Sequence, residues 1–202
     1  MRIVVDWDGT ITEVDGLYEA ICTFGDERIY EETEDRLGRE LTLNEVIAVE
    51  IGTITASLDE VVDWVRGNVR LRDGFTRFAR RHRPLVVSSG FHELIEPVLE
   101  REGLLDLEVR ATRLDPRPDG WRALFRNGEP CPVCGESCKR ADVEGIDELV
   151  YVGDGVSDRC VALAASRVFA RDGLARYLAA RGAPFEPFED FADVEARLVA
   201  AP

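Results

Sequence analysis

The chain has 202 residues, 45% of them hydrophobic and 32% charged, a composition that excludes disordered and collagen-like proteins. Its formal net charge of −15 repels phosphate backbones and anionic headgroups, so we expect neither nucleic acid nor a membrane as partner. No apolar run approaches the roughly 20 residues of a spanning helix, and the start MRIVVDWDGT has acids where a signal peptide is apolar. We therefore expect a cytoplasmic protein, either a monomer or a homodimer.

The first predicted element is a buried strand at residues 2–6, a β-branched run that ends in acids and a glycine. Residues 15–70 then contain several helical patterns, with capping boxes that begin at Thr42 and Ser57. A helical insertion directly after the first strand would cover the ligand-binding end of a sheet. We therefore expect these residues to form a cap.

The remaining pattern alternates strands and helices. A helix is predicted after Gly74, strands at 84–88 and 149–152 each precede a helical stripe, and 114–140 is expected to be mostly loop. This order predicts an α/β fold, a Rossmann-like parallel sheet with helices on both faces and ligands beyond the carboxyl ends of its strands. The predicted domains are a core of residues 1–14 and 71–202 and a helical cap of residues 15–70.

Four segments place charged or hydroxyl groups just after a predicted strand or in the loops beyond it. Carboxylates two positions apart on an extended chain point the same way, and small residues after a serine let backbone N–H groups approach an anion. The segments are Asp6-Trp7-Asp8-Gly9-Thr10, Ser88-Ser89-Gly90, Lys139 and Gly153-Asp154-Gly155-Val156-Ser157-Asp158.

The charges of these segments predict a cation. Two unit charges about 4 Å apart repel by roughly 4 kcal/mol at an effective dielectric near 20, so the four carboxylates cannot converge unaided. Because the available ligands are all oxygens, Mg²⁺ is the expected ion. Together with Lys139 it would offset the charge of a transferring phosphoryl group.

In this order, D-x-D-G-T, a hydrophobic run ending in Ser, a lone Lys and G-D-G-x-x-D resemble the four motifs of the haloacid dehalogenase (HAD) superfamily of aspartate-nucleophile phosphatases. The helical insertion resembles that superfamily's first type of cap. Residues 71–75, 87–91 and 134–139 resemble the phosphoserine-phosphatase-like subgroup. The cysteines before Lys139 resemble those of its methionine-salvage phosphatases, which act on 2-hydroxy-3-keto-5-methylthiopentenyl-1-phosphate.

The resemblance implies a Mg²⁺-dependent phosphomonoesterase acting on a small phosphorylated metabolite. Asp6 would attack phosphorus to form an aspartyl phosphate. Asp8 would bind Mg²⁺ through its carbonyl, protonate the leaving alcohol and then deprotonate the hydrolytic water. Asp154 would ligate Mg²⁺, and Asp158 would support either the metal's shell or Lys139.

The resemblance also implies a phosphate cradle of Ser88, Ser89, Gly90 and Lys139, with Ser88 and Lys139 in catalytic contact with phosphoryl oxygens. Substrate specificity is expected in the cap, around the two residues Asp15 and Tyr18.

Two departures from the subgroup's pattern count against phosphoserine as substrate. Ser89 stands where phosphoserine phosphatases usually carry glycine, and Asp15 where they carry glutamate. Phosphoserine hydrolysis and phosphotransfer to an alcohol remain alternatives within the superfamily, and a catalytically silent phosphate sensor is the alternative from another class. His92 is either a substrate contact or a surface residue.

The sequence leaves the cysteines open between several states. Cys131, Cys134 and Cys138 have a spacing that can bind zinc, although a closed site needs a fourth ligand. Cys160 lies on a helical stripe and is expected in the core. Zinc, a disulfide or reduced thiols are all compatible, and in each case the cluster would shape the loop that presents Lys139.

Overall fold

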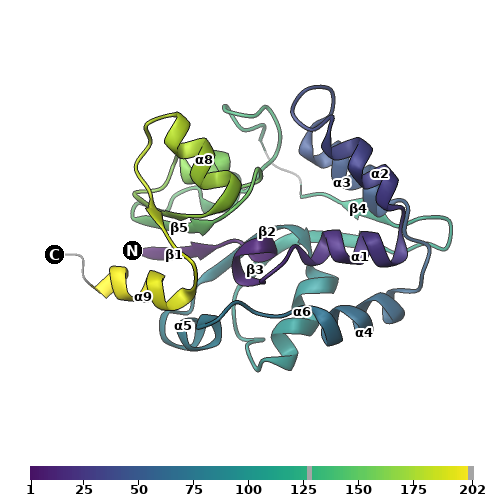
Figure 1. The fold of residues 1–202 in the computed structure, drawn as a ribbon, viewed down its shortest axis with the longest axis horizontal. Helices are drawn as coiled ribbons and strands as arrows, with labels where there is room; N and C mark the ends of the chain where they lie inside the picture. The colour runs from purple at the N-terminus through teal and green to yellow at the C-terminus, as the bar shows by residue number, and fades with distance from the viewer. Residues whose placement is uncertain (127–128, 200–202) are drawn as a thin grey trace.

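The computed structural model describes residues 1–126 and 129–199, and within them the chain forms one seven-stranded sheet. The strand order is β4-β3-β2-β1-β5-β6-β7, with β1 at the centre (Figure 1). Neighbouring strands run parallel except for β4, which pairs with β3 in antiparallel fashion. The strands are β1 (Arg2–Val5), β2 (Leu85–Phe91), β3 (Val109–Asp115), β4 (Arg122–Leu124), β5 (Leu149–Gly153), β6 (Arg167–Ala170) and β7 (Glu186–Pro187). The predicted α/β fold class is confirmed.

Helices cover both faces of the sheet. Alternate residues of β1 show this, because Ile3 and Val5 pack with α5, α6 and α9, whereas Val4 packs with α7 and α8. In the described part of the chain, no helix is both long enough and apolar enough to cross a bilayer. The helices are α1 (Gly16–Phe24), α2 (Glu27–Glu34), α3 (Leu43–Ile51), α4 (Leu58–Asn68), α5 (Phe75–His82), α6 (His92–Arg101), α7 (Arg159–Ala162), α8 (Asp172–Ala180) and α9 (Phe191–Val199), with the short turns η1 (Trp7–Ile11) and η2 (Ala141–Val143).

The insertion after β1 consists of α1 to α4, as its patterns predict. Thr42 begins α3 with a complete capping box, and Ser57 begins α4 by accepting the N–H of Glu60 at 3.3 Å. In Figure 1, α1 to α3 lie beyond the end of β1 and α4 lies beside α6. Apolar residues of the insertion and of the sheet belong to one continuous core. The division into two domains stays a prediction, and residues 127–128 and 200–202 of the predicted core domain lie outside the described residues.

Two elements differ from the sequence-based expectation. β2 continues past its predicted end at Ser88 through Ser89 and Gly90 to Phe91, because these residues keep an extended backbone although they break the apolar pattern. The pairing of β2 with β3 shifts register over this stretch, an irregularity typical of strands beside functional sites. β3 and β4 occupy part of the predicted loop 114–140, where short amphipathic strands give a weak signal among prolines and glycines.

A buried carboxyl group lies between α2 and α3. Glu50 is 3% exposed, and its Oε1 accepts the hydroxyl of Thr33 at 2.7 Å. Burial raises the pKa of Glu50 to about 7, against the smaller opposing effect of the Thr33 hydrogen bond. Because the folded state holds this proton more tightly than the unfolded chain, stability is highest below the unfolded pKa near 4.5 and falls as pH rises through about 7.

We therefore expect Glu50→Gln to become more stable relative to wild type as pH rises. The difference in unfolding free energy between the two proteins should grow by roughly 2–3 kcal/mol between pH 4.5 and pH 8, measured by urea denaturation. Glu31→Gln, at an exposed position of α2, is the matched control and should follow the wild-type curve. If the unfolding free energies of Glu50→Gln and wild type changed with pH in parallel, the raised pKa of Glu50 would be contradicted.

Candidate active site

The four predicted segments meet at the carboxyl ends of β1, β2 and β5. They line one cavity of about 170 Å³, which α1, α2 and α3 cover from the other side (Figure 1). This arrangement follows from the parallel order of the three strands, which ends each of them at the same edge of the sheet. The predicted residues at the cavity are Asp6, Asp8, Asp15, Tyr18, Ser88, Ser89, Gly90, Lys139 and Asp154.

A buried ammonium group joins two of the segments. Lys139 is 1% exposed, and its Nζ donates to Oδ1 of Asp6 and, at 2.8 Å, to Oδ1 of Asp158. Burial lowers the pKa of Lys139, but the charges of Asp158 and Asp6 outweigh this effect and raise it. The lysine therefore stays charged, and an ammonium has a third N–H to offer to a ligand.

Asp158 is a supporting group for this lysine. Its Oδ1 also accepts the hydroxyl of Tyr151 at 2.5 Å, and its Oδ2 accepts the backbone N–H groups of Asp154 and Gly155, each at 2.9 Å. Burial raises the pKa of Asp158, but Lys139 and these hydrogen bonds lower it below its usual value. The sequence predicts that Asp158 supports either the metal's shell or Lys139. Because both of its carboxylate oxygens already accept hydrogen bonds, the geometry favours the support of Lys139.

The loop after β1 brings its backbone against Asp154. Thr10 donates its hydroxyl to Oδ1 of Asp154 at 2.6 Å. Gly9 has φ +70°, and a Cβ at this position would lie 2.5 Å from Oδ2 of Asp154. Only glycine therefore permits both this backbone conformation and this close approach.

Arg72 binds the backbone of the same loop. Its guanidinium donates to the backbone carbonyls of Gly9 at 2.7 Å, Thr10 at 2.8 Å and Thr12 at 3.0 Å. Arg72, Thr10 and Tyr151 have no assigned role in the sequence-based interpretation. Their contacts join residues far apart in the chain, and no local spacing identifies such contacts.

The carboxylates at the cavity fit a hard divalent cation. Asp6, Asp154 and Asp158 each offer an oxygen within 4.8 Å of the others. Burial, followed by the charges of Asp158 and Asp154, raises the pKa of Asp6 well above its usual value. Burial and Asp158 likewise raise the pKa of Asp154 to about 6. A cation with oxygen ligands, such as Mg²⁺, would relieve this repulsion.

Asp8 and Ser88 present polar groups to the cavity, both of them close to Gly90. Asp8 accepts the N–H of Gly16 at 2.9 Å, and its pKa is raised by burial and then by the charge of Asp15. Ser88 is 1% exposed and accepts the N–H of Gly90 at 2.9 Å. Because this bond uses a lone pair, the hydroxyl proton of Ser88 remains available to an anion.

The insertion contributes the remaining walls. Asp15 caps α1 by accepting the N–H of Tyr18 at 2.9 Å. This hydrogen bond joins the two predicted specificity residues. Apolar and acidic side chains of the insertion complete the lining: Leu17, Tyr30, Glu34, Leu37, Leu43, Val46, Ile47 and Glu50.

His92 takes a structural position. Its Nδ1 lies 2.7 Å from Glu96 on the same helix, and its Nε2 accepts the N–H of Ala111 in β3 at 3.2 Å. The ring is partly buried and holds α6 against the sheet. The structure therefore supports neither the substrate contact nor the free surface position.

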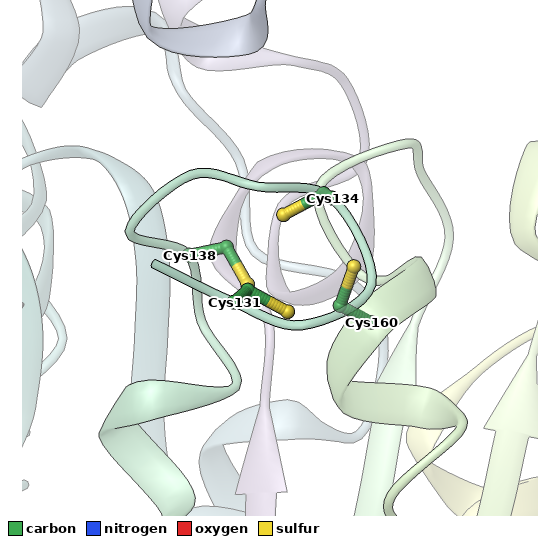
Figure 2. A group of neighbouring side chains, drawn as sticks. All are labelled: Cys131, Cys134, Cys138 and Cys160. Atoms are coloured by element: carbon green, nitrogen blue, oxygen red, sulfur yellow. The ribbon is translucent and has the colours of Figure 1, made fainter. Parts of the chain in front are cut away.

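The cysteines form a second cluster, beside the loop that carries Lys139. The sulfur atoms of Cys131, Cys134, Cys138 and Cys160 all lie within 4.8 Å of one another (Figure 2). Cys160 is buried as expected, and its thiol also lies close to the other three, a contact that the sequence did not predict. The helical stripe shows which face of α7 is covered and does not show what covers it.

Comparison with known proteins identifies relatives along nearly the whole chain. Residues 3–163 match the haloacid dehalogenase-like hydrolase family. A 2-hydroxy-3-keto-5-methylthiopentenyl-1-phosphate phosphatase of Geobacillus thermodenitrificans is 30% identical, over 94% of this chain and 91% of the relative. A protein of the same name from Exiguobacterium is 26% identical, over 96% and 95% of the two chains.

Solved structures show the same fold. A phosphoserine phosphatase studied as a phospho-aspartyl intermediate analogue superposes with a TM-score of 0.70 at 18% identity, covering 97% of both chains. A substrate-bound phosphoserine phosphatase gives a TM-score of 0.70 at 17% identity, with the same coverage. The predicted superfamily and its phosphatase class are confirmed. The chain belongs to the haloacid dehalogenase-like hydrolase family.

Proposed function

We propose that the chain is a Mg²⁺-dependent phosphomonoesterase in which Asp6 is the nucleophile. The observation that carries this proposal is the buried carboxylate of Asp6, in contact with the ammonium of Lys139 at the end of a cavity lined by Ser88 and Asp154. Hydroxyl and ammonium donors, together with carboxylates that can hold a cation, are what a transferring phosphoryl group needs.

The first step is attack of a carboxylate oxygen of Asp6 on phosphorus. The P–O bond to the leaving alcohol breaks as the aspartyl phosphate forms, and Asp8 gives its proton to the departing oxygen. The raised pKa of Asp8 supports this role, because a carboxyl group that keeps its proton near neutral pH can act as general acid. The hydroxyl of Ser88 and the third N–H of Lys139 hold the phosphoryl oxygens during transfer.

The second step returns the enzyme to its starting state. A water molecule attacks phosphorus while Asp8, now ionised, takes its proton, and the bond between Asp6 and phosphorus breaks to release inorganic phosphate. Lys139 remains bonded to Asp158 throughout and so keeps its place beside the reacting group. Protons and bonds therefore balance over the two steps.

Mg²⁺ would be held by carboxylate oxygens of Asp6 and Asp154, which lie within 4.8 Å of each other. The family resemblance adds the backbone carbonyl of Asp8 as a third protein ligand. When bound, the ion supplies positive charge that offsets the carboxylates and the phosphate ester. We assign Asp158 to the support of Lys139, because all of its contacts are to donors of the chain.

We infer that the leaving alcohol carries no anionic group of its own. Among the described residues that line the cavity, Lys139 is the only cation, whereas Asp15, Glu34 and Glu50 are acidic. Arg126 lines an adjoining cavity, where it pairs with Asp142 at 2.8 Å. A carboxylate on the substrate would have no partner here, which disfavours phosphoserine.

The apolar part of the wall suits an uncharged organic group. The pentenyl phosphate named for the curated relatives has a methylthio end and no carboxylate, so it is our first candidate.

We further propose that residues 15–70 act as the cap that encloses it, and that the enzyme works in the cytoplasm. Of the alternatives, phosphotransfer to an alcohol would pass through the same aspartyl phosphate. A catalytically silent phosphate sensor is disfavoured, because it would not need Asp8 as an acid and base.

We expect Asp6→Asn to lower the turnover of 4-nitrophenyl phosphate by at least about a thousandfold, because an amide cannot form the acyl phosphate. Asp8→Asn should lower kcat/KM by roughly 10²–10⁴ for an alkyl phosphate and by less for the aryl ester, since nitrophenolate leaves without a proton. Asp59→Asn, at an exposed position of α4, is the control and should retain wild-type rates. Substantial turnover by Asp6→Asn, or equal losses of Asp8→Asn on both esters, would refute the assigned roles.

A matched pair of substrates tests the inferred leaving group. Phosphoethanolamine is phosphoserine without its carboxylate, so we expect its kcat/KM to be higher by about tenfold or more. Glu34→Gln should narrow this ratio because it removes a negative charge from the wall, whereas Glu31→Gln should not. A wild-type preference for phosphoserine would overturn the inference about the leaving group while leaving the phosphatase chemistry intact.

A further inference from the structure

The cysteine cluster is built from two distant segments of the chain. Cys131, Cys134 and Cys138 come from one loop, and Cys160 reaches them from α7 (Figure 2). In a tetrahedral site with Zn–S bonds of about 2.3 Å, the sulfur atoms lie about 3.8 Å apart. The observed separations, all within 4.8 Å, need only small side-chain movements to reach this geometry.

The backbone of the loop is arranged to stabilise a thiolate. The N–H of Val133 donates to Sγ of Cys131 at 3.4 Å, and the N–H of Gly135 closes the turn on the carbonyl of Cys131 at 2.8 Å. Gly135 follows Cys134 with φ +79°, which favours glycine. A thiolate is stabilised by a backbone N–H that donates to its sulfur, as Val133 does to Cys131. The loop therefore offers this donor in addition to the convergence of four thiols.

We propose that Cys131, Cys134, Cys138 and Cys160 bind one structural Zn²⁺ ion as a closed four-thiolate site. Four sulfur ligands leave no open position for a substrate or water, so the ion has a structural role. A disulfide would use only two of the four convergent thiols. The tetrahedral sulfur set excludes Mg²⁺, which prefers oxygen, so the two metals occupy separate sites.

The zinc site would fix the position of the active-site lysine. Cys138 directly precedes Lys139, and Cys160 lies two residues after Asp158. A metal shared by these cysteines therefore ties together the two segments whose side chains meet at 2.8 Å. This consequence rests on the proposed function, whereas the metal site itself does not.

The direct test is the metal content of the purified full-length protein, measured by plasma mass spectrometry. We expect about one zinc per chain in wild type and in Cys22→Ser, whose thiol lies outside the cluster, and well under half of that in Cys160→Ser. Cys134→Ser, at an exposed position of the loop, provides a second variant if Cys160→Ser does not fold. Full zinc retention by a folded cluster variant would overturn the proposal.

Replacement of the metal by Co²⁺ tests the ligand set without any assay of activity. Wild type should show the intense sulfur-to-cobalt absorption of a tetrahedral tetrathiolate. In Cys160→Ser the absorption per bound cobalt ion should fall by about a quarter, because one of four Co–S bonds is removed. Failure of wild type to bind either Zn²⁺ or Co²⁺ after reduction, or a native disulfide found by thiol counting, would refute the site. A wild-type protein with zinc but without phosphatase activity would refute the proposed function alone.

Discussion

The structure depends on one buried ammonium group. Lys139 lies almost fully covered between Asp6 and Asp158, and an ammonium in such surroundings is tolerated only when its partners are held in place. Tyr151 and two backbone N–H groups hold Asp158. The central strands supply both anchors, because Asp6 directly follows β1 and Tyr151 lies in β5, opposite Val4 of β1.

Negative charge is the other constraint on the site, and it limits what can bind. The carboxylates at the cavity outnumber the lysine, and the proposed Mg²⁺ would offset the negative charge that a phosphate ester meets there. Two further acidic residues of the cavity wall, Asp15 and Glu34, disfavour negative charge on the organic part of the substrate as well. The same electrostatic argument therefore supports a metal cofactor and an alcohol without a carboxylate.

The sequence predicted the fold class and the set of residues at the cavity because parallel strands end at one edge, so that residues which follow different strands must meet. It did not identify Tyr151 or Arg72, whose roles arise from contacts between distant segments. The sequence also did not identify Cys160 as a neighbour of the other cysteines, because a helical stripe does not reveal contacts with a distant loop. The sequence did not predict β3, whose apolar residues are interrupted by arginines, or the edge strand β4, which has only three residues.

In the proposed mechanism Asp6 is the nucleophile that forms a covalent phosphoenzyme, and Lys139 and the metal hold the phosphoryl group. The most direct measurement is a crystal structure of the protein with Mg²⁺ and beryllium fluoride, which mimics a phosphoryl group bonded to a carboxylate. We expect beryllium on a carboxylate oxygen of Asp6, with its fluorides near Ser88 and Lys139. Beryllium fluoride on another residue, or a site that excludes it while Mg²⁺ is bound, would show that Asp6 is not the nucleophile.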